Sequence, residues 1–106
     1  MKKVYNKLVR DFIPQIIESN GDKCNTRVLD DIEYIAELNK KLQEEVAEYL
    51  ESGKIEEICD IYEVLMALLD AYKVGFSQFQ LQRLDKAAKR GAFKEKIFLI
   101  DTETNE

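Results

Sequence analysis

The sequence contains no histidine among its 106 residues. This absence excludes a Ser-His-Asp triad, a Cys-His pair and any zinc or iron site with a histidine ligand. Any catalysis must therefore come from carboxylates, Lys, Arg, Tyr or a hard metal ion held by oxygen atoms.

Cysteines and long apolar runs are also scarce. The two cysteines, Cys24 and Cys59, have no CxxC spacing, and we expect both thiols to be reduced. The longest apolar run, residues 64–69, is far shorter than the roughly 20 residues of a membrane span. The first residues, MKKVYNKLVRDFIP, carry charges where a signal peptide needs an apolar stretch. We therefore expect a cytoplasmic protein that does not bind a membrane.

The charge balance is acidic, with 16 Lys and Arg against 21 Asp and Glu. The resulting net charge of -5 repels phosphates on average, so we expect no nucleic acid polymer as a partner. A local basic patch could still hold one small phosphorylated ligand. Hydrophobic residues make up 45% of the chain and charged residues 35%, which is typical of a folded and not of a disordered protein.

Turn-forming residues divide the chain into four blocks with helical periodicity. We expect helices over about residues 9–19, 32–52, 54–73 and 78–90, with Asp30 or Asp31 capping the second and Ser77 capping the fourth. Short extended segments at 25–29 and 96–100 predict a peripheral β pairing. The sequence thus predicts a single, mainly α domain over residues 1–100, followed by a frayed polar tail over residues 101–106.

The third expected helix is apolar over an unusually wide arc. At 100° per residue its apolar side chains cover about 220° of the helical wheel; they are Ile55, Ile58, Cys59, Ile61, Tyr62, Val64, Leu65, Met66, Leu68, Leu69 and Tyr72. Such a helix must pack against neighbours on several sides, and a chain this short offers few. We therefore expect a helix bundle completed by dimerisation, although a well-wrapped monomer would also cover these side chains.

Carboxylates recur on the two central helices at a spacing of i, i+3. Glu45 and Glu48 share one face of the first, and Glu57 and Asp60 share one face of the second. The short loop at Ser52-Gly53 predicts an antiparallel hairpin, which brings the four acids together.

Three interpretations of these acids are open. Most Glu-rich stretches are solvated helix faces, but Glu57 falls inside the apolar sector of its helix. A hairpin laced with ion pairs, such as Lys41 with Glu44 or Glu45, is the commonest alternative. The third interpretation is a site for Mg²⁺ or Mn²⁺, because oxygen-only ligands on rigid helices suit these ions and crowded carboxylates are otherwise costly.

At these positions the sequence resembles a known family. Residues 45–48 (EVAE) and 57–60 (EICD) are similar to the paired ExxE and ExxD motifs of MazG-like nucleoside triphosphate pyrophosphohydrolases. The opening YNKLVRD of residues 5–11, with Ile13-Pro14, resembles a small branch often labelled phosphoribosyl-ATP pyrophosphohydrolase-like. That branch commonly carries Lys and then Arg-Gly-Gly-Phe near its end; here Lys86 precedes Arg90-Gly91-Ala92-Phe93, with Ala in place of the second Gly.

The resemblance implies an all-α oligomer, dimeric or tetrameric, with Mg²⁺-dependent hydrolysis between the α- and β-phosphates of a nucleotide. The products would be a nucleoside monophosphate and pyrophosphate. By position, the implied metal ligands are Glu45, Glu48, Glu57 and Asp60. Glu44 is implied to lie just outside the ligands or to orient the attacking water, which makes Glu44, Glu45 and Glu57 the catalytic candidates.

Basic residues supply candidate phosphate contacts. Lys7 and Arg10 are spaced i, i+3, whereas Lys86 and Arg90 are spaced i, i+4 on the last helix. A solvated cationic helix end is an equally good explanation for the second pair.

An alternative to the enzyme is a non-catalytic dimeric helical module that binds a nucleotide or a protein. Within the enzyme hypothesis, phosphoribosyl-ATP, a dNTP and a damaged nucleotide are all open as substrates.

Overall fold

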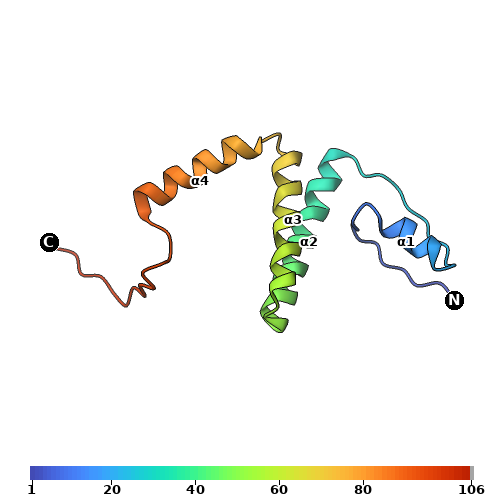
Figure 1. Cartoon of the computed structure of the whole chain (residues 1–106), viewed down its shortest axis with the longest axis horizontal. Helices are drawn as coiled ribbons and strands as arrows, with labels where there is room; N and C mark the ends of the chain where they lie inside the picture. The colour runs from blue at the N-terminus through green and yellow to red at the C-terminus, as the bar shows by residue number, and fades with distance from the viewer. Residues whose placement is uncertain (106) are drawn as a thin grey trace. The chain divides into compact units, whose positions relative to one another are not determined.

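The computed structural model describes residues 1–105, which form four α-helices joined by irregular segments (Figure 1). The helices are α1 (Ile13–Ser19), α2 (Asp31–Ser52), α3 (Ile55–Ala71) and α4 (Phe76–Arg90). This confirms the mainly α fold class. None of the described helices is both long and apolar enough to cross a membrane. The chain divides into two compact units, one over residues 1–74 and one beginning at Gly75.

Local capping signals define both ends of α2. The Asp30 side chain accepts a hydrogen bond from the backbone N–H of Glu33 at 2.8 Å, as an N-cap residue does. At the other end Gly53 adopts a left-handed conformation, with φ 67°, and its N–H donates to the carbonyl of Tyr49 at 2.8 Å. The predicted helix and its Asp30 cap are therefore confirmed.

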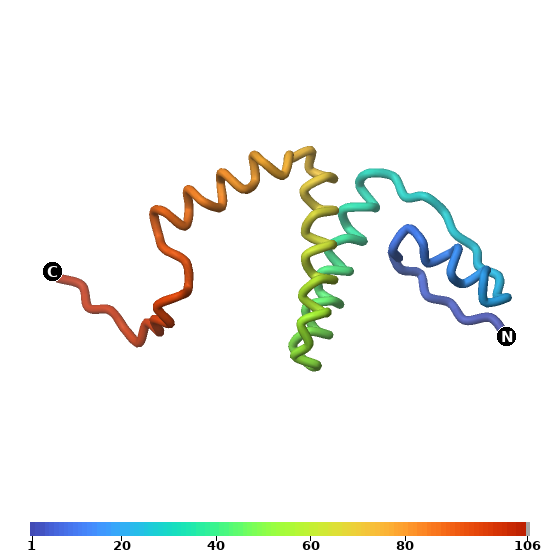
Figure 2. Tube along the Cα trace, viewed as in Figure 1, coloured from blue at the N-terminus to red at the C-terminus, as the bar shows by residue number. Residues whose placement is uncertain are grey.

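α2 and α3 form the antiparallel hairpin that the sequence predicts, and they lie side by side along their length (Figure 2). Only Gly53 and Lys54 connect them. The buried residues of the hairpin are few: Leu38 is 3% exposed, Val64 is 8% exposed, and the third is a carboxylate, Glu45, at 7%. One of the predicted site residues, Glu45, is thus buried in the hairpin that α2 and α3 form.

The wide apolar arc of α3 is divided between two faces. Val64 is buried, with Ile61 and Leu68 half-buried on the same side, where α3 meets α2. A second face follows the spacing 3, 4, 3, 4, 3 along the helix and remains largely open; its residues, here called the α3 stripe, are Ile55, Ile58, Tyr62, Leu65, Leu69 and Tyr72.

α1 begins later than predicted. Pro14 falls in its first turn, which is the part of a helix where a proline is tolerated, so the helix starts at Ile13 and not at residue 9. Residues 1–10 carry no regular structure, and the side chains of this N-terminal segment reach the hairpin through ion pairs.

The second unit consists of α4 and an irregular segment. Gly75, not Ser77, occupies the N-cap position, so α4 starts two residues before the predicted bound. The expected β pairing of 25–29 with 96–100 is not formed, since residues 1–105 contain no strand. Lys96 has φ 59° and donates its N–H to the Phe93 carbonyl at 3.2 Å, so a turn replaces the first residue of that strand. Residues 101–105 carry no helix or strand, and residue 106 of the expected tail lies outside the described residues.

Candidate metal centre

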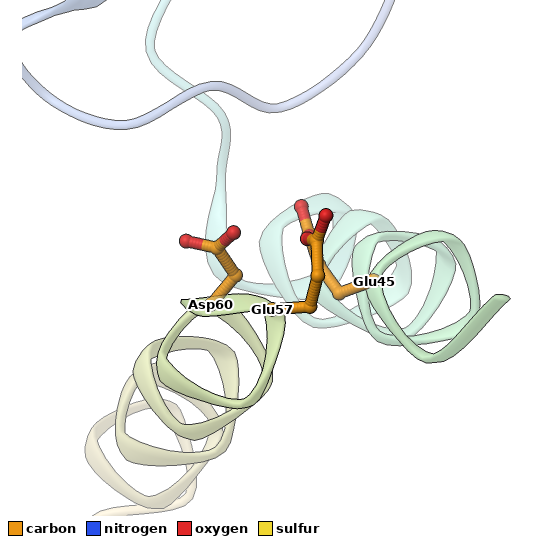
Figure 3. Close-up of side chains that lie close together, drawn as sticks. All are labelled: Glu45, Glu57 and Asp60. Carbon is orange, nitrogen blue, oxygen red and sulfur yellow. The ribbon is translucent and has the colours of Figure 1, made fainter. Parts of the chain in front are cut away.

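Three carboxylates from two helices converge on one side of the hairpin. Glu45 comes from α2, whereas Glu57 and Asp60 come from the first two turns of α3. One oxygen from each lies within 4.8 Å of the other two, and Figure 3 shows the three side chains turned to the same side. We call these three residues the acidic cluster. The sequence predicted that four acids meet, and three of them do, whereas Glu48 is not among the converging oxygens.

Glu45 is the least hydrated member of the cluster. It is 7% exposed, and its Oε2 atom is buried without a hydrogen-bond partner. The other oxygen, Oε1, lies 3.5 Å from Nζ of Lys41. Burial, and then the neighbouring Glu48 carboxylate, raise the pKa of Glu45 above its ordinary value. A buried carboxylate oxygen with no donor is costly, and a cation would remove that cost.

Glu57 is half-buried, as its position in the apolar sector predicted. Its pKa is also raised, first by burial and then by the negative charges of Glu48 and Asp60. Glu48 itself is exposed and is not one of the three residues whose oxygens converge. It lies close enough to act on the pKa of both Glu45 and Glu57, so it borders the acidic cluster.

Glu44 pairs with two lysines, one of which, Lys41, it shares with Glu45. Its Oε1 accepts a hydrogen bond from Lys7 at 3.1 Å and lies 3.6 Å from Nζ of Lys41. These cations lower the pKa of Glu44, chiefly through the hydrogen bond from Lys7, and Glu44 in turn raises the pKa of Lys7. Glu44 therefore stays ionised beside the cluster.

Arg10 is bound to the cluster itself. Its guanidinium donates to Oδ1 of Asp60 at 2.7 Å and lies 3.9 Å from Oε1 of Glu63. The sequence marked Arg10 as a phosphate contact and gave no sign of this pair, because 50 positions separate the partners. Glu63 was missed for the same reason.

Lys86 and Arg90 lie on α4, in the second unit. Their i, i+4 spacing on a helix is confirmed, and Arg90 is in the last turn. The neighbouring Lys89 forms an ion pair with Asp85 at 3.1 Å. These positions fit a solvated cationic helix end as well as a phosphate contact.

The donor set of the acidic cluster fits a hard divalent cation. All three donors are carboxylate oxygens, the ligands that Mg²⁺ and Mn²⁺ prefer. Oxygens around one such ion lie about 2.9 to 4.2 Å apart at bond lengths of about 2.1 Å. Small side-chain rotations would therefore suffice to bring oxygens within 4.8 Å of one another onto one ion. The orphaned Oε2 of Glu45 is the atom that most needs such a partner.

The ion-pair interpretation is supported as well. Lys41 lies 3.5 Å from Glu45 and 3.6 Å from Glu44, as that interpretation predicted. Lysine and arginine thus offset part of the negative charge, but the described contacts leave one Glu45 oxygen and the half-buried Glu57 without a cation. The hairpin therefore combines ion pairs with a group of incompletely neutralised acids.

Comparisons with known proteins identify no family for the chain. No family model matches the chain, and no solved structure matches it. A stretch of 42 residues, 40% of the chain, is 52% identical to an uncharacterized protein of Mycolicibacterium smegmatis. The match spans 43% of that protein's length.

Proposed function

We propose that the protein is a Mg²⁺-dependent nucleotide pyrophosphohydrolase, with Mn²⁺ as a possible substitute ion. The observation that carries the proposal is the buried, partnerless Oε2 of Glu45 beside carboxylates from a second helix. The similarity of residues 45–48 and 57–60 to the ExxE and ExxD motifs of MazG-like enzymes supports the same function. Cleavage would fall between the α- and β-phosphates, releasing a nucleoside monophosphate and pyrophosphate.

Each site residue has a proposed task. Glu45, Glu57 and Asp60 hold the ion, with exposed Glu48 as a fourth ligand. A bound divalent cation offsets the triphosphate's charge and lowers the pKa of a bound water. Glu44, kept ionised by Lys7, orients the attacking water. Lys7 and Arg10 contact phosphates from beside the cluster, and Lys86 and Arg90 are proposed as phosphate contacts on their helical spacing alone.

The α3 stripe, rather than a hollow of the surface, favours a dimer as the working form. Two hollows, of about 360 and 320 Å³, lie elsewhere: Phe12, Gln15, Ile16 and Ser19 line one, and residues 90–97 line the other. The α3 stripe repeats like one face of a helix pair, and Ile55, Tyr62 and Tyr72 on it are 52 to 75% exposed. We infer that the stripe packs against a second copy of the chain.

A product assay tests the enzyme. The protein is incubated with Mg²⁺ and a panel of NTPs and dNTPs, and pyrophosphate and orthophosphate are measured separately. We expect pyrophosphate, abolished by EDTA and reduced by about 10- to 100-fold or more in Glu57→Gln and Asp60→Asn. The matched control is Glu56→Gln, which removes the adjacent, exposed carboxylate and should retain activity.

The alternative is a non-catalytic dimeric helical module, and the ion pairs of Lys7, Arg10 and Lys41 favour it. Such a module would have no need of a metal ion. No pyrophosphate release above background, or a release that Glu57→Gln and Asp60→Asn leave unchanged, would contradict the proposed enzyme and support the module.

A further inference from the structure

Arg10 forms the shortest ion pair of the acidic cluster, and the pair is exposed. The guanidinium and the Asp60 carboxylate are 2.7 Å apart, with 55% and 38% of the two side chains open to solvent. Exposed pairs contribute little to stability, so the contact is easily broken. Arg10 also belongs to an N-terminal segment without helix or strand, whose side chains pair with acids of α2 and α3.

We propose that Arg10 exchanges partners: it pairs with Asp60 while the cluster holds no metal ion, and it turns to the phosphates of the substrate once the ion is bound. The proposal rests on the proposed function, since it requires both a metal ion and a phosphorylated ligand. It adds an order to that function, with the metal ion entering before Arg10 becomes available to the substrate.

Charge makes the exchange favourable in both steps. Without a metal ion, Arg10 is the cation closest to Asp60 and offsets part of the cluster's negative charge. A divalent cation among Glu45, Glu57 and Asp60 takes over that role and repels a guanidinium held at the same carboxylate. The released guanidinium suits a phosphate group, to which Arg can donate two parallel hydrogen bonds.

This exchange predicts two effects of opposite sign for Arg10→Gln. The variant lacks the internal competitor, so it should bind Mn²⁺ about three- to tenfold more tightly than the wild-type protein. It also lacks the phosphate contact, so in excess Mg²⁺ it should bind inorganic pyrophosphate about tenfold more weakly. Replacing a residue that only supports the fold would not raise the affinity for Mn²⁺ and lower the affinity for pyrophosphate.

Calorimetric titrations of the full chain with Mn²⁺ alone, and with pyrophosphate in excess Mg²⁺, measure both effects. The matched control is Arg27→Gln, because Arg27 also pairs with a carboxylate, Glu33 at 2.8 Å, outside the cluster; both affinities should stay at wild-type values. Arg10→Lys keeps the charge but not the planar fork. It should bind Mn²⁺ as the wild-type protein does and pyrophosphate more weakly.

The outcomes separate this inference from the proposed function. A wild-type protein without saturable Mn²⁺ binding would overturn the proposed function and the exchange with it. If the wild-type protein binds Mn²⁺ but Arg10→Gln leaves that affinity unchanged or weakens it, the exchange alone is overturned. Tighter Mn²⁺ binding with unchanged pyrophosphate binding also overturns it, because Arg10 would then compete with the ion without serving the substrate.

Discussion

At the scale of single residues, Glu45 is unusual because it is a buried carboxylate. The carboxylate is 7% exposed at the contact of α2 with α3, where an apolar side chain would ordinarily pack. Lys41 meets one of its oxygens, and the other has no donor. Burial and the neighbouring Glu48 carboxylate raise the pKa of Glu45, so keeping this side chain ionised costs free energy of folding.

Replacing Glu45 by Gln should stabilise the metal-free protein by about 1 kcal/mol. The amide removes the buried charge, and its NH₂ group can donate to a neighbouring carboxylate. The free energy of unfolding from urea titrations with EDTA present measures the change. Glu44→Gln is the matched control: Lys7 lowers the pKa of Glu44, so losing that charge should leave stability unchanged or slightly reduced. A Glu45→Gln variant less stable than the wild-type protein would show that the buried Glu45 carboxylate does not destabilise the fold.

The same carboxylate predicts a pH dependence of stability. Because burial raises the folded-state pKa of Glu45 above its unfolded value, the cost is fully present above the folded pKa. It disappears as the pH falls through the folded pKa toward the unfolded value of about 4.3. The advantage of Glu45→Gln over the wild-type protein should therefore be largest near pH 8 and nearly absent near pH 4.5. Unfolding titrations at several pH values in EDTA test this; a constant difference would contradict it.

The sequence predicted individual acids unequally well. Glu45 lies about 40° from the centre of the Leu38 and Leu42 stripe on the helical wheel, and it is buried. Glu48 lies about 100° from that centre, and it is exposed. Helical geometry alone thus separates the two. Helical geometry could not predict the contacts of Lys7 with Glu44 and of Arg10 with Asp60, because the partners are 37 and 50 positions apart in the sequence.

At the scale of elements, the turn between α2 and α3 sets the register that brings the acids together. Gly53 ends α2 in a left-handed conformation that is unfavourable for residues other than glycine. The helix bounds that the sequence predicted well rest on local signals of this kind, such as Asp30 and Gly53. The bounds that it missed lack such a signal: Gly75 caps α4 with no side chain, and a turn at Lys96 replaces a strand suggested by weak alternation alone.

Gly53→Ala should lower the free energy of unfolding by about 1 kcal/mol, since alanine at φ 67° is strained. Gly75→Ala is the matched control, because Gly75 has φ -69° and nothing lies within 4 Å of an added Cβ. Because Gly75 is the N-cap of α4, where alanine is less favourable than glycine, this variant should lose only a few tenths of a kcal/mol. Thermal and urea unfolding compare the two variants, and equal effects would show that the Gly53 conformation does not hold the turn.

At the scale of the whole molecule, the α3 stripe predicts self-association. Light scattering after size exclusion should give the wild-type protein twice the chain mass of 12.4 kDa. Leu65→Glu, at a 40% exposed stripe position, should give 12.4 kDa with its helical circular dichroism retained. Val28→Glu places the same charge at a 97% exposed residue outside the stripe and should leave the dimer intact. A monomeric wild-type protein would contradict the dimer, and another part of the same chain would then have to cover the α3 stripe.

The central claim is that the acidic cluster binds a divalent cation, and Mn²⁺ titration followed by amide NMR tests it most directly, because the paramagnetic ion broadens nearby signals. Saturable broadening centred on Glu45, Glu57 and Asp60, lost in Glu57→Gln and kept in Glu56→Gln, is the expected result. Broadening spread over the exposed acids of all helices, or unchanged in Glu57→Gln, would contradict the claim.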